Sequence, residues 1–373
     1  MTRALVVGGT GPTGIPLVRG LVDRGYDVTI VHRGLHERAE TPARVAHVHI
    51  DPYDDDALRG LFDGSTFDAR TFDVVIAMYG RLRRIAELTA GRVGQFVSVG
   101  GVPAYRGWMN PWLFDPPGLP VPVAEDAPTV ERPEDDEKGY RIVRSEDAVL
   151  EHHPRAAHFR YPYVYGPHQL VPREWLVVRR ILDGRDRIVV ADGGLTLHHH
   201  GYTENLAHAL LLAVDQPDRA AGRIFNAGDE EVLSIRQVVE LIAGALGHRF
   251  EIVSMPFDLA PCARPLLAQP LPTHRVLDIG RVRTELGYAD VVPARVAVAV
   301  TARWLADNPC APGGPEEHVL TDPFDYAAED RLIEGWRSAI GALPDPRFDA
   351  SPGYGLAYSG PGGRLRSNEE FEA

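Results

Sequence analysis

The first residues that could do chemistry form a glycine turn near the start of the chain. An apolar run, Ala4–Val7, leads into Gly8-Gly9-Thr10-Gly11-Pro12-Thr13-Gly14, and an amphipathic stretch follows from Ile15 to Val22. Glycines permit close backbone approach, and the free amides and dipole of a helix N-terminus attract negative charge. Glycine triplets are often only turns, but a strand before this one and a helix after it give the context that a dinucleotide site requires. We therefore predict that these seven residues bind the linked phosphates of a dinucleotide.

The end of the second predicted strand distinguishes between cofactors. This strand leads into His32-Arg33-Gly34, where an NAD site usually carries an acidic residue that accepts from the ribose hydroxyls. Arginine can instead bind a phosphate bidentately. The sequence therefore favours NADP(H), with Arg33 on the 2′-phosphate, over NAD(H); a solvated arginine beside a turn is the alternative. Asp51, after the third strand, is expected to accept from the adenine amino group or to cap a turn before Pro52.

Two later segments add a resemblance to a known family. Tyr140-Arg-Ile-Val-Arg144 falls on a predicted helix, and Arg160-Tyr-Pro-Tyr-Val-Tyr-Gly-Pro167 follows a short predicted strand. With the glycine turn, Arg33 and Asp51, they resemble the extended or atypical short-chain dehydrogenases/reductases, the NAD-dependent epimerase/dehydratase family, over residues 3–305. The resemblance implies an α/β enzyme with a Rossmann-type, doubly wound parallel sheet and a smaller C-terminal substrate-binding lobe.

The catalytic residues of this family are only partly matched. The family uses a Tyr-x-x-x-Lys pair, whose spacing puts both side chains on one helix face, and a nearby Ser or Thr. The cation lowers the pKa of the phenol, which can then exchange a proton while hydride moves. Tyr140 matches the tyrosine, and Arg144 keeps the charge of the lysine but is a poor proton relay. The hydroxyl position falls near Gly101; Ser98 is the nearest hydroxyl, and the amides of Gly100 and Gly101 are the alternative donors.

The resemblance also supplies the remaining site residues. Besides the glycine turn, Arg33 and Asp51, the expected cofactor contacts are His32, Ala77, Met78, Tyr140, Arg144, Pro162, Tyr163 and Val164. The expected substrate contacts are Gly101, Tyr165, His168, Arg173 and His200. We predict no metal at His198-His199-His200, because adjacent residues of a strand face opposite sides and zinc sites need spaced ligands.

These residues lead to a functional expectation with an alternative. We expect an NADP(H)-dependent oxidoreductase or epimerase of a small polar metabolite, sugar nucleotides being the commonest substrates of the extended group, with Tyr140 as acid/base. The alternative is a catalytically impaired sensor or scaffold that still binds NADP(H). The net charge of −13 argues against nucleic acid as a partner. Homodimers are common in the family, so the resemblance makes a homodimer a candidate assembly, while the residues themselves leave the oligomeric state open.

The elements that must position these residues alternate in type. Strands are predicted at Ala4–Val7, Asp27–Val31, Val45–Ile50, Val74–Ala77, Gln95–Val99, His158–Tyr161, Arg187–Val190 and Gly222–Asn226. Helices are predicted at Ile15–Arg24, Ala57–Phe62, Arg81–Ala90, Lys138–Glu151, Trp175–Asp183, Thr203–Val214 and Ala294–Asp307, with another capped by Ser234. Alternation of this kind favours a parallel sheet with crossover helices.

The bulk properties are those of an ordinary globular protein. We expect a dinucleotide domain over 1–165, a substrate lobe over 166–310 with segments returning to the sheet, an extension over 311–345 and a flexible tail over 346–373. Only Cys262 and Cys310 occur, so a reducing compartment fits. With no signal peptide and no apolar run long enough to span a membrane, a soluble cytoplasmic protein is expected.

Overall fold

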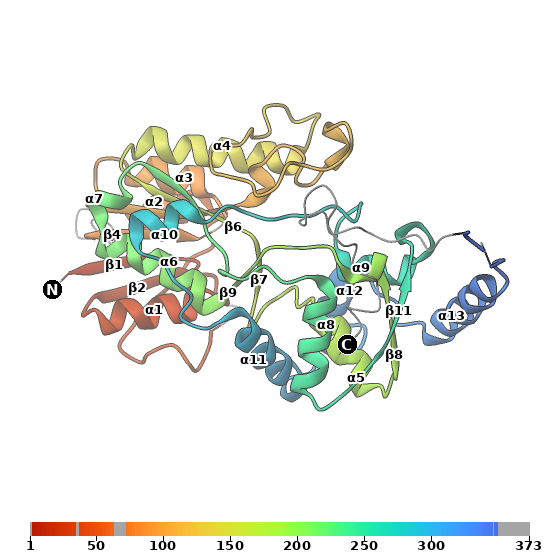
Figure 1. Cartoon of the computed structure of the whole chain (residues 1–373). Helices are drawn as coiled ribbons and strands as arrows, with labels where there is room; N and C mark the ends of the chain where they lie inside the picture. The colour runs from red at the N-terminus through yellow and green to blue at the C-terminus, as the bar shows by residue number, and fades with distance from the viewer. Residues whose placement is uncertain (1, 35–36, 63–71, 79, 346, 350–373) are drawn as a thin grey trace, which may run out of the picture. The chain divides into compact units, whose positions relative to one another are not determined.

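The computed structural model describes residues 2–34, 37–62, 72–78, 80–345 and 347–349 (Figure 1). The chain divides into two compact units, Met1–Phe324 and Asp325–Ala373. In the second unit, helix α13 spans Tyr326–Gly341. Most of the predicted flexible tail lies outside the described residues. In the described part of the chain, none of the helices combines the length and apolar character needed to cross a bilayer.

The first unit is built on a seven-stranded sheet. Its order is β10-β6-β5-β4-β1-β2-β3, and every pairing is parallel. The strands are β1 (Arg3–Val7), β2 (Asp27–His32), β3 (Ala46–His49), β4 (Val74–Met78), β5 (Gln95–Gly101), β6 (Ala157–Tyr161) and β10 (Arg223–Asn226). The strand order reverses between β1 and β4, where α/β proteins bind ligands. The predicted doubly wound parallel sheet is confirmed.

Helices cover both faces of this sheet because its strands are apolar on both sides. Along β1, Ala4 and Val6 enter one core with Leu17 of α1, whereas Leu5 and Val7 enter another. The first core also contains α6, and the second contains α2, α3 and Val149 of α4. These helices are α1 (Gly14–Asp23), α2 (Asp55–Phe62), α3 (Leu82–Thr89), α4 (Glu137–His152) and α6 (Thr203–Asp215).

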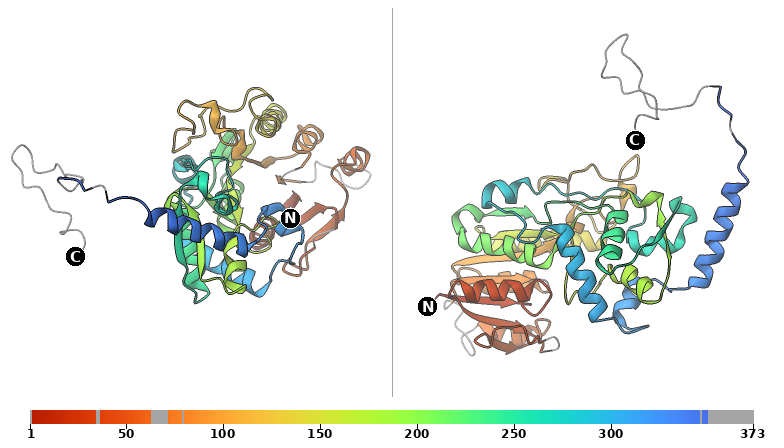
Figure 2. Two further views of the ribbon diagram at one scale, coloured as in Figure 1. Left: turned by 90° about the vertical axis from the view of Figure 1, so that its right-hand side faces the viewer. Right: turned by 60° about the horizontal axis from the view of Figure 1, so that its bottom comes forward.

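Most of the remaining elements of this unit form a lobe beyond the carboxyl ends of the strands (Figures 1 and 2). Its core joins α5 (Trp175–Leu182), α8 (Ile235–Ala245) and α11 (Ala294–Asp307). Ser234 caps α8 in a capping box with Gln237, as its sequence predicted. Two small parallel pairs complete the lobe, β8 (Arg187–Ala191) with β11 (Glu251–Met255) and β7 (Tyr163–Tyr165) with β9 (His200–Tyr202). Of the short helices, α9 (Arg264–Leu267) and α12 (Pro315–Leu320) pack in this lobe, whereas α7 (Pro217–Ala220) and α10 (Gly280–Leu286) pack in the core of the sheet that contains α6.

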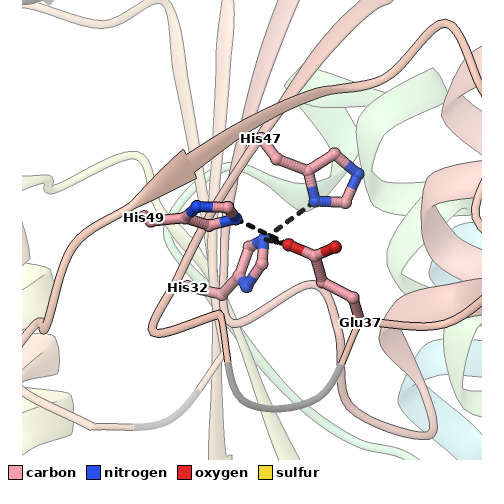
Figure 3. Close-up of side chains that lie close together, drawn as sticks. All are labelled: His32, Glu37, His47 and His49. Atoms are coloured by element: carbon pink, nitrogen blue, oxygen red, sulfur yellow. Dashed lines mark hydrogen bonds and ion pairs between the residues drawn. The ribbon is translucent and has the colours of Figure 1, made fainter.

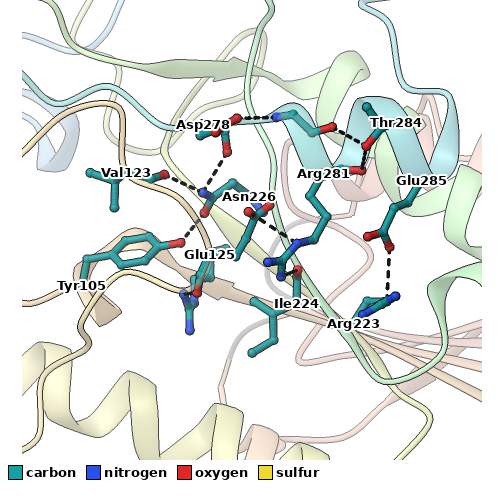
Figure 4. Close-up of polar contacts among 12 residues, drawn as sticks. Tyr105, Val123, Glu125, Arg223, Ile224, Asn226, Asp278, Arg281, Thr284 and Glu285 are labelled. Carbon is teal, nitrogen blue, oxygen red and sulfur yellow. Dashed lines mark hydrogen bonds and ion pairs between the residues drawn. The ribbon is translucent and has the colours of Figure 1, made fainter.

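A buried polar network fastens the long connection between β5 and α4 to the edge of the sheet (Figure 4). The hydroxyl of Tyr105 donates to Oδ1 of Asn226 at 2.6 Å. Nδ2 of Asn226 donates to the carbonyls of Val123 and Asp278 at 2.9 and 3.0 Å. Its amide donates to Oε1 of Glu125 at 2.9 Å. One side chain at the end of β10 therefore joins three separate segments that border the site.

Candidate cofactor and substrate site

The glycine turn lies at the carboxyl end of β1 and is required by its packing. Gly8 has a φ of +89°, and a Cβ there would lie 2.6 Å from the carbonyl oxygen of Met78. A Cβ on Gly14 would lie 2.3 Å from the carbonyl oxygen of Gly9. The turn thus passes close to the end of β4, and α1 begins directly against the turn. No larger residue fits at either position without moving the backbone.

Gly11 differs from these two glycines because its surroundings are open. A Cβ there would meet only the carbonyl oxygen of Gly8, at 3.8 Å. Within the described residues, the amides of Gly9, Thr10 and Thr13 donate to no backbone carbonyl. Free amides at the start of a helix, with the positive end of its dipole, form a cradle for an anion. This geometry suits the pyrophosphate of a dinucleotide.

The predicted adenosine contacts lie at the ends of β2, β3 and β4. Arg33 is exposed, whereas His32 is buried and accepts from the amide of Gly34 through Nδ1 at 3.0 Å. Asp51 is exposed, and its Oδ1 accepts from the amide of Tyr53 at 3.0 Å. This hydrogen bond belongs to the turn, which is one of the two roles expected for Asp51 from the sequence. Ala77 and Met78 are buried at the end of β4.

A cleft of about 1210 Å³ separates the end of the sheet from the lobe. Its walls come from the end of β5, from α3 and α4, from the β6–β7 connection and from the lobe; they include Gly100, Gly101, Lys138, Ile142, Ser145, Pro162, Tyr163, Arg173, His198 and Arg275. The described lining carries seven basic side chains, Arg81, Arg83, Arg84, Lys138, Arg141, Arg173 and Arg275, against two carboxylates, Glu87 and Glu137. The cleft is therefore cationic although the chain carries a net charge of −13.

Helix α4 does not turn Tyr140 and Arg144 into this cleft. Its buried side carries Gly139, Glu146 and Val149, and a Cβ on Gly139 would lie 2.4 Å from the carbonyl oxygen of Pro103. With this side held against the sheet, a period of 3.6 residues turns positions 140 and 144 away from it.

The α4 residues that line the cleft are instead Glu137, Lys138, Arg141, Ile142, Ser145, Ala148 and His152. Tyr140 is half-buried. The side chain of Arg144 is 56% exposed and lies 3.6 Å from Asp147. The predicted spacing is present in the sequence, but the structure leaves both residues out of the described lining.

Ser98 lies beneath the cleft in a buried network. Its hydroxyl is 2.8 Å from Nδ1 of His158, and both residues are buried. Burial lowers the pKa of His158 to about 4. Nε2 of His158 lies 3.3 Å from Glu146, which holds Arg160 through bonds of 2.5 and 2.8 Å.

His158 reaches the cleft wall because Gly100 lies in front of it. It is among the residues that line the cleft, and a Cβ on Gly100 would lie 2.5 Å from its Nε2. Sequence reasoning did not single out His158. The only signal was that His158 and Arg160 alternate with apolar residues in a short strand.

The lobe side of the cleft presents two arginines, of which Arg275 is buried and Arg173 is half-buried. The guanidinium of Arg173 lies 3.8 Å from the ring centroid of Tyr163, and its Nη1 is 3.1 Å from Nδ1 of His198. Arg275 lies 5.6 Å from the ring centroid of Trp108, and burial lowers its pKa to about 10. In the described part of the chain, neither guanidinium has a carboxylate oxygen within 4.0 Å. A buried cation such as Arg275 is costly unless an anion joins it.

Comparison of the sequence with known proteins finds relatives that match only part of the chain. No family model matches the sequence. The chain is 28% identical over 170 residues to the uncharacterized protein y4nL of Sinorhizobium fredii, covering 40% of this chain and 47% of that protein. It is 32% identical over 82 residues to UDP-D-apiose/UDP-D-xylose synthase 2 of Arabidopsis thaliana, covering 22% and 21%. The chain thus spans less than half the length of these curated relatives.

Solved structures match over most of the chain. The chain superposes on a UDP-galactose 4-epimerase with a TM-score of 0.61 at 17% identity, covering 83% of this chain and 100% of that one. It superposes on WbmG of Bordetella bronchiseptica in complex with NAD with a TM-score of 0.63 at 17% identity, covering 82% and 94%. The chain shares its fold with these solved structures. UDP-glucuronic acid 4-epimerase of Bacillus cereus in complex with NAD matches similarly, with a TM-score of 0.63 at 15% identity, covering 83% and 100%.

Within this fold, the other predicted substrate residues divide between two places. Gly101 and Arg173 line the cleft, as do Pro162 and Tyr163 of the predicted nicotinamide segment; Val164 follows in β7, paired with Gly201. Three predicted substrate residues, Tyr165, His200 and His168, are absent from the described lining of the cleft. Tyr165 donates to Asp229 at 2.7 Å, and His200 lines a separate small cavity with Tyr165 and Glu174. His168 contacts Glu40 at 3.0 Å.

The three adjacent histidines also have different surroundings. His198 lines the cleft, whereas the ring of His199 contacts the carbonyl of Asp229 at 2.8 Å and accepts from the amide of Leu277 at 3.1 Å. The rings of His198 and His200 stack with centroids 5.0 Å apart. Burial lowers the pKa of His199 to about 4. The ring of His199 is thus held by backbone groups, while its two neighbours stack on each other.

Proposed function

We propose that the chain is a nicotinamide-dependent enzyme that reduces or epimerises a small anionic metabolite, with nucleotide-linked sugars as the favoured class. One observation carries this proposal: a glycine turn at the reversal point of the sheet and a cationic cleft whose far wall holds the buried Arg275 and the half-buried Arg173, neither with a carboxylate partner among the described residues. A dinucleotide phosphate suits the free amides of the turn. A substrate phosphate suits Arg173 and Arg275. The UDP-galactose and UDP-glucuronic acid epimerases that share the fold support the same substrate class.

The proposed cofactor is NADP(H). Arg33 is exposed after β2, and no acidic side chain takes the place from which the ribose hydroxyls are usually bound. When bound, the nicotinamide would supply or accept the hydride. Binding of NAD by the fold's solved neighbours makes NAD(H) the competing cofactor.

Lys138 is the proposed proton donor in place of Tyr140. It lines the cleft at the start of α4, where Asp136 caps the helix by accepting from the amides of Lys138 and Gly139. When hydride adds to a carbonyl carbon, electrons move onto the carbonyl oxygen. The ammonium of Lys138 can donate a proton to that oxygen, which leaves an alcohol and a neutral amine.

The experiment that tests the cofactor site replaces Gly11 with alanine. Because a Cβ there has ordinary contact distances, the variant keeps its stability, while the added methyl group blocks close approach of the pyrophosphate. We expect calorimetry to show weaker NADP(H) binding with an unchanged melting temperature. Gly244→Ala is the matched control, since a Cβ at Gly244 has no neighbour within 4 Å. Equal affinity of Gly11→Ala and the control for NADP(H) would exclude the glycine turn as the site.

A second candidate function is a sensor that binds NADP(H) without turnover. It is favoured by Gly101 at the hydroxyl position and by the orientation of Tyr140 and Arg144 away from the cleft. Tight cofactor binding without oxidation or reduction of any nucleotide sugar would favour the sensor over the enzyme.

A further inference from the structure

A cluster of three histidines and a glutamate lies at the edge of the sheet, apart from the cleft (Figure 3). His47 and His49 are two residues apart on β3 and therefore point to the same face. His32, the last residue of β2, pairs in register with His49. Glu37 comes from the segment that connects these strands and completes the cluster. Strand register, rather than sequence proximity, brings these side chains together.

The donor atoms converge on one small space. Nε2 of His32 lies 2.8 Å from Nδ1 of His47, and Nε2 of His49 lies 2.6 Å from Oε1 of Glu37. Nε2 of His32 is 4.0 Å from the same glutamate oxygen, and one ligand atom from each residue lies within 4.8 Å of all the others. Ligands held at ~2.0–2.1 Å around a tetrahedral zinc ion are ~3.3 Å apart. Shifts on the order of 1 Å would therefore place all four donors around one ion.

The chemistry of the donor set selects the kind of ion. Imidazole nitrogens favour zinc and neighbouring transition metals, whereas calcium and magnesium require mainly oxygen ligands.

We propose that His32, His47, His49 and Glu37 bind one zinc ion. Four protein ligands leave no open position for a substrate, which is the arrangement of a structural zinc site. The ion would join β2, β3 and the segment that carries Glu37, just after Arg33. This inference goes beyond the proposed enzymatic function: no ligand of the ion is among the described residues that line the cleft, although His32 directly precedes Arg33, the proposed contact of the 2′-phosphate.

The hydrogen bonds of the cluster distinguish His32 from the other proposed ligands. Gly34 donates its amide to Nδ1 of His32, so the neutral ring carries its hydrogen on Nε2 and donates it to His47. Zinc at Nε2 displaces that hydrogen to Nδ1, and the amide of Gly34 must turn away. Gly34 has a φ of +78°, a conformation that glycine adopts readily. His32 is therefore the weakest ligand, while the exposed rings of His47 and His49 can exchange tautomers freely.

The test measures zinc binding by the untagged, full-length protein after treatment with a chelator. Calorimetric titration with zinc chloride should show one equivalent bound. Replacing His47 or His49 with alanine should weaken zinc binding at least about tenfold. Even the loss of a residue that only hydrogen-bonds to a metal ligand typically lowers metal affinity by about 10–100-fold. His32→Ala should cause a smaller loss. His318→Ala, an exposed histidine of α12, is the matched control and should bind zinc like the wild type.

Two results would overturn the proposal. One is the absence of zinc uptake by the wild-type chain, which would leave a hydrogen-bonded histidine cluster without an ion. The other is uptake that persists in the His47→Ala/His49→Ala double variant. Both rings are exposed, so this variant should fold, and circular dichroism checks that it does. Cobalt provides a second readout, because its visible absorption reports tetrahedral coordination that the double variant should lose.

Discussion

Lys138 and Tyr140 are two residues apart on α4, yet only Lys138 lines the cleft. Gly139 between them lies against Pro103, which fixes the rotation of the helix. The matching of Tyr140 and Arg144 to a catalytic pair relied on a spacing of four residues. That spacing guarantees a shared helix face but not which face it is.

Kinetics of two variants distinguish these residues. Lys138→Met should lower kcat by about 10²–10⁴-fold, because a positioned proton donor contributes about that much. Tyr140→Phe should leave kcat nearly unchanged. Cofactor affinity, measured by calorimetry, should be the same in both variants and in the wild type. A large loss in Tyr140→Phe with full activity in Lys138→Met would restore the tyrosine as acid/base.

We expect Arg275 to contribute to binding of an anionic substrate and to lower the stability of the protein without substrate. Its guanidinium is buried, has no carboxylate within 4.0 Å among the described residues, and has an Nε without a hydrogen-bond partner. Arg275→Met should weaken binding of UDP, used as an anionic probe, by about 2 kcal/mol or more, roughly thirtyfold. The melting temperature of the free protein should not fall, since the variant removes a buried charge. A lower melting temperature with unchanged UDP affinity would make Arg275 structural.

At the scale of elements, the cleft depends on a loop that the sheet edge holds in place. Asn226 at the end of β10 is fully buried and makes four hydrogen bonds to Tyr105, Val123, Glu125 and Asp278. All four partners lie on segments that come from other parts of the sequence. Loss of this side chain would therefore loosen the loop from the sheet and the segment before α10 together.

Asn226→Ala should lower the free energy of unfolding by about 2–3 kcal/mol, because it leaves buried donors and acceptors without partners. Urea denaturation measures the change. Asn308→Ala is the matched control: its exposed amide bonds only to Trp304 of the preceding helix, and the expected change is within about 0.5 kcal/mol. Equal effects of the two substitutions would show that the network does not fasten the loop.

At the scale of the whole molecule, buried histidines make stability depend on pH. The pKa of His158 falls from an ordinary 6.5 to about 4. Between these values the unfolded chain binds the proton and the folded chain does not. The contribution of His158 is therefore fully present above pH 6.5 and is lost as the pH falls toward 4. Glu174 has the opposite sign, because burial raises its pKa to about 7 and the folded state holds the extra proton.

His158→Gln should flatten this dependence. Each such histidine adds a slope of about 1.4 kcal/mol per pH unit between the two pKa values, so the variant should lose less stability than the wild type between pH 6.5 and 4.5. Urea denaturation at several pH values measures both slopes. Parallel profiles would mean that His158 is already protonated in the folded protein. Glu174→Gln, the matched control, should steepen the profile instead.

Much of the fold could be predicted from the sequence because it is encoded locally. Apolar runs of strand length, glycines at the first turn and the Ser234 cap each act through neighbouring residues, and the structure contains the predicted strands and helices with ends shifted by a few residues. The glycine turn is a special case: the packing that requires Gly8 and Gly14 involves segments that meet only in the fold, but glycine itself is visible in the sequence.

The side chains that face the cleft could not be predicted in the same way. Helical phase depends on which residues of α4 pack on the sheet, so Tyr140 and Lys138 were indistinguishable by spacing. The arginine pair of the lobe joins positions 173 and 275, and the histidine cluster joins two strands through their register. Local patterns in the chain thus determined its elements and the start of its dinucleotide site. Only tertiary packing decided which charges meet in the cleft, because distances between remote residues are set by the fold.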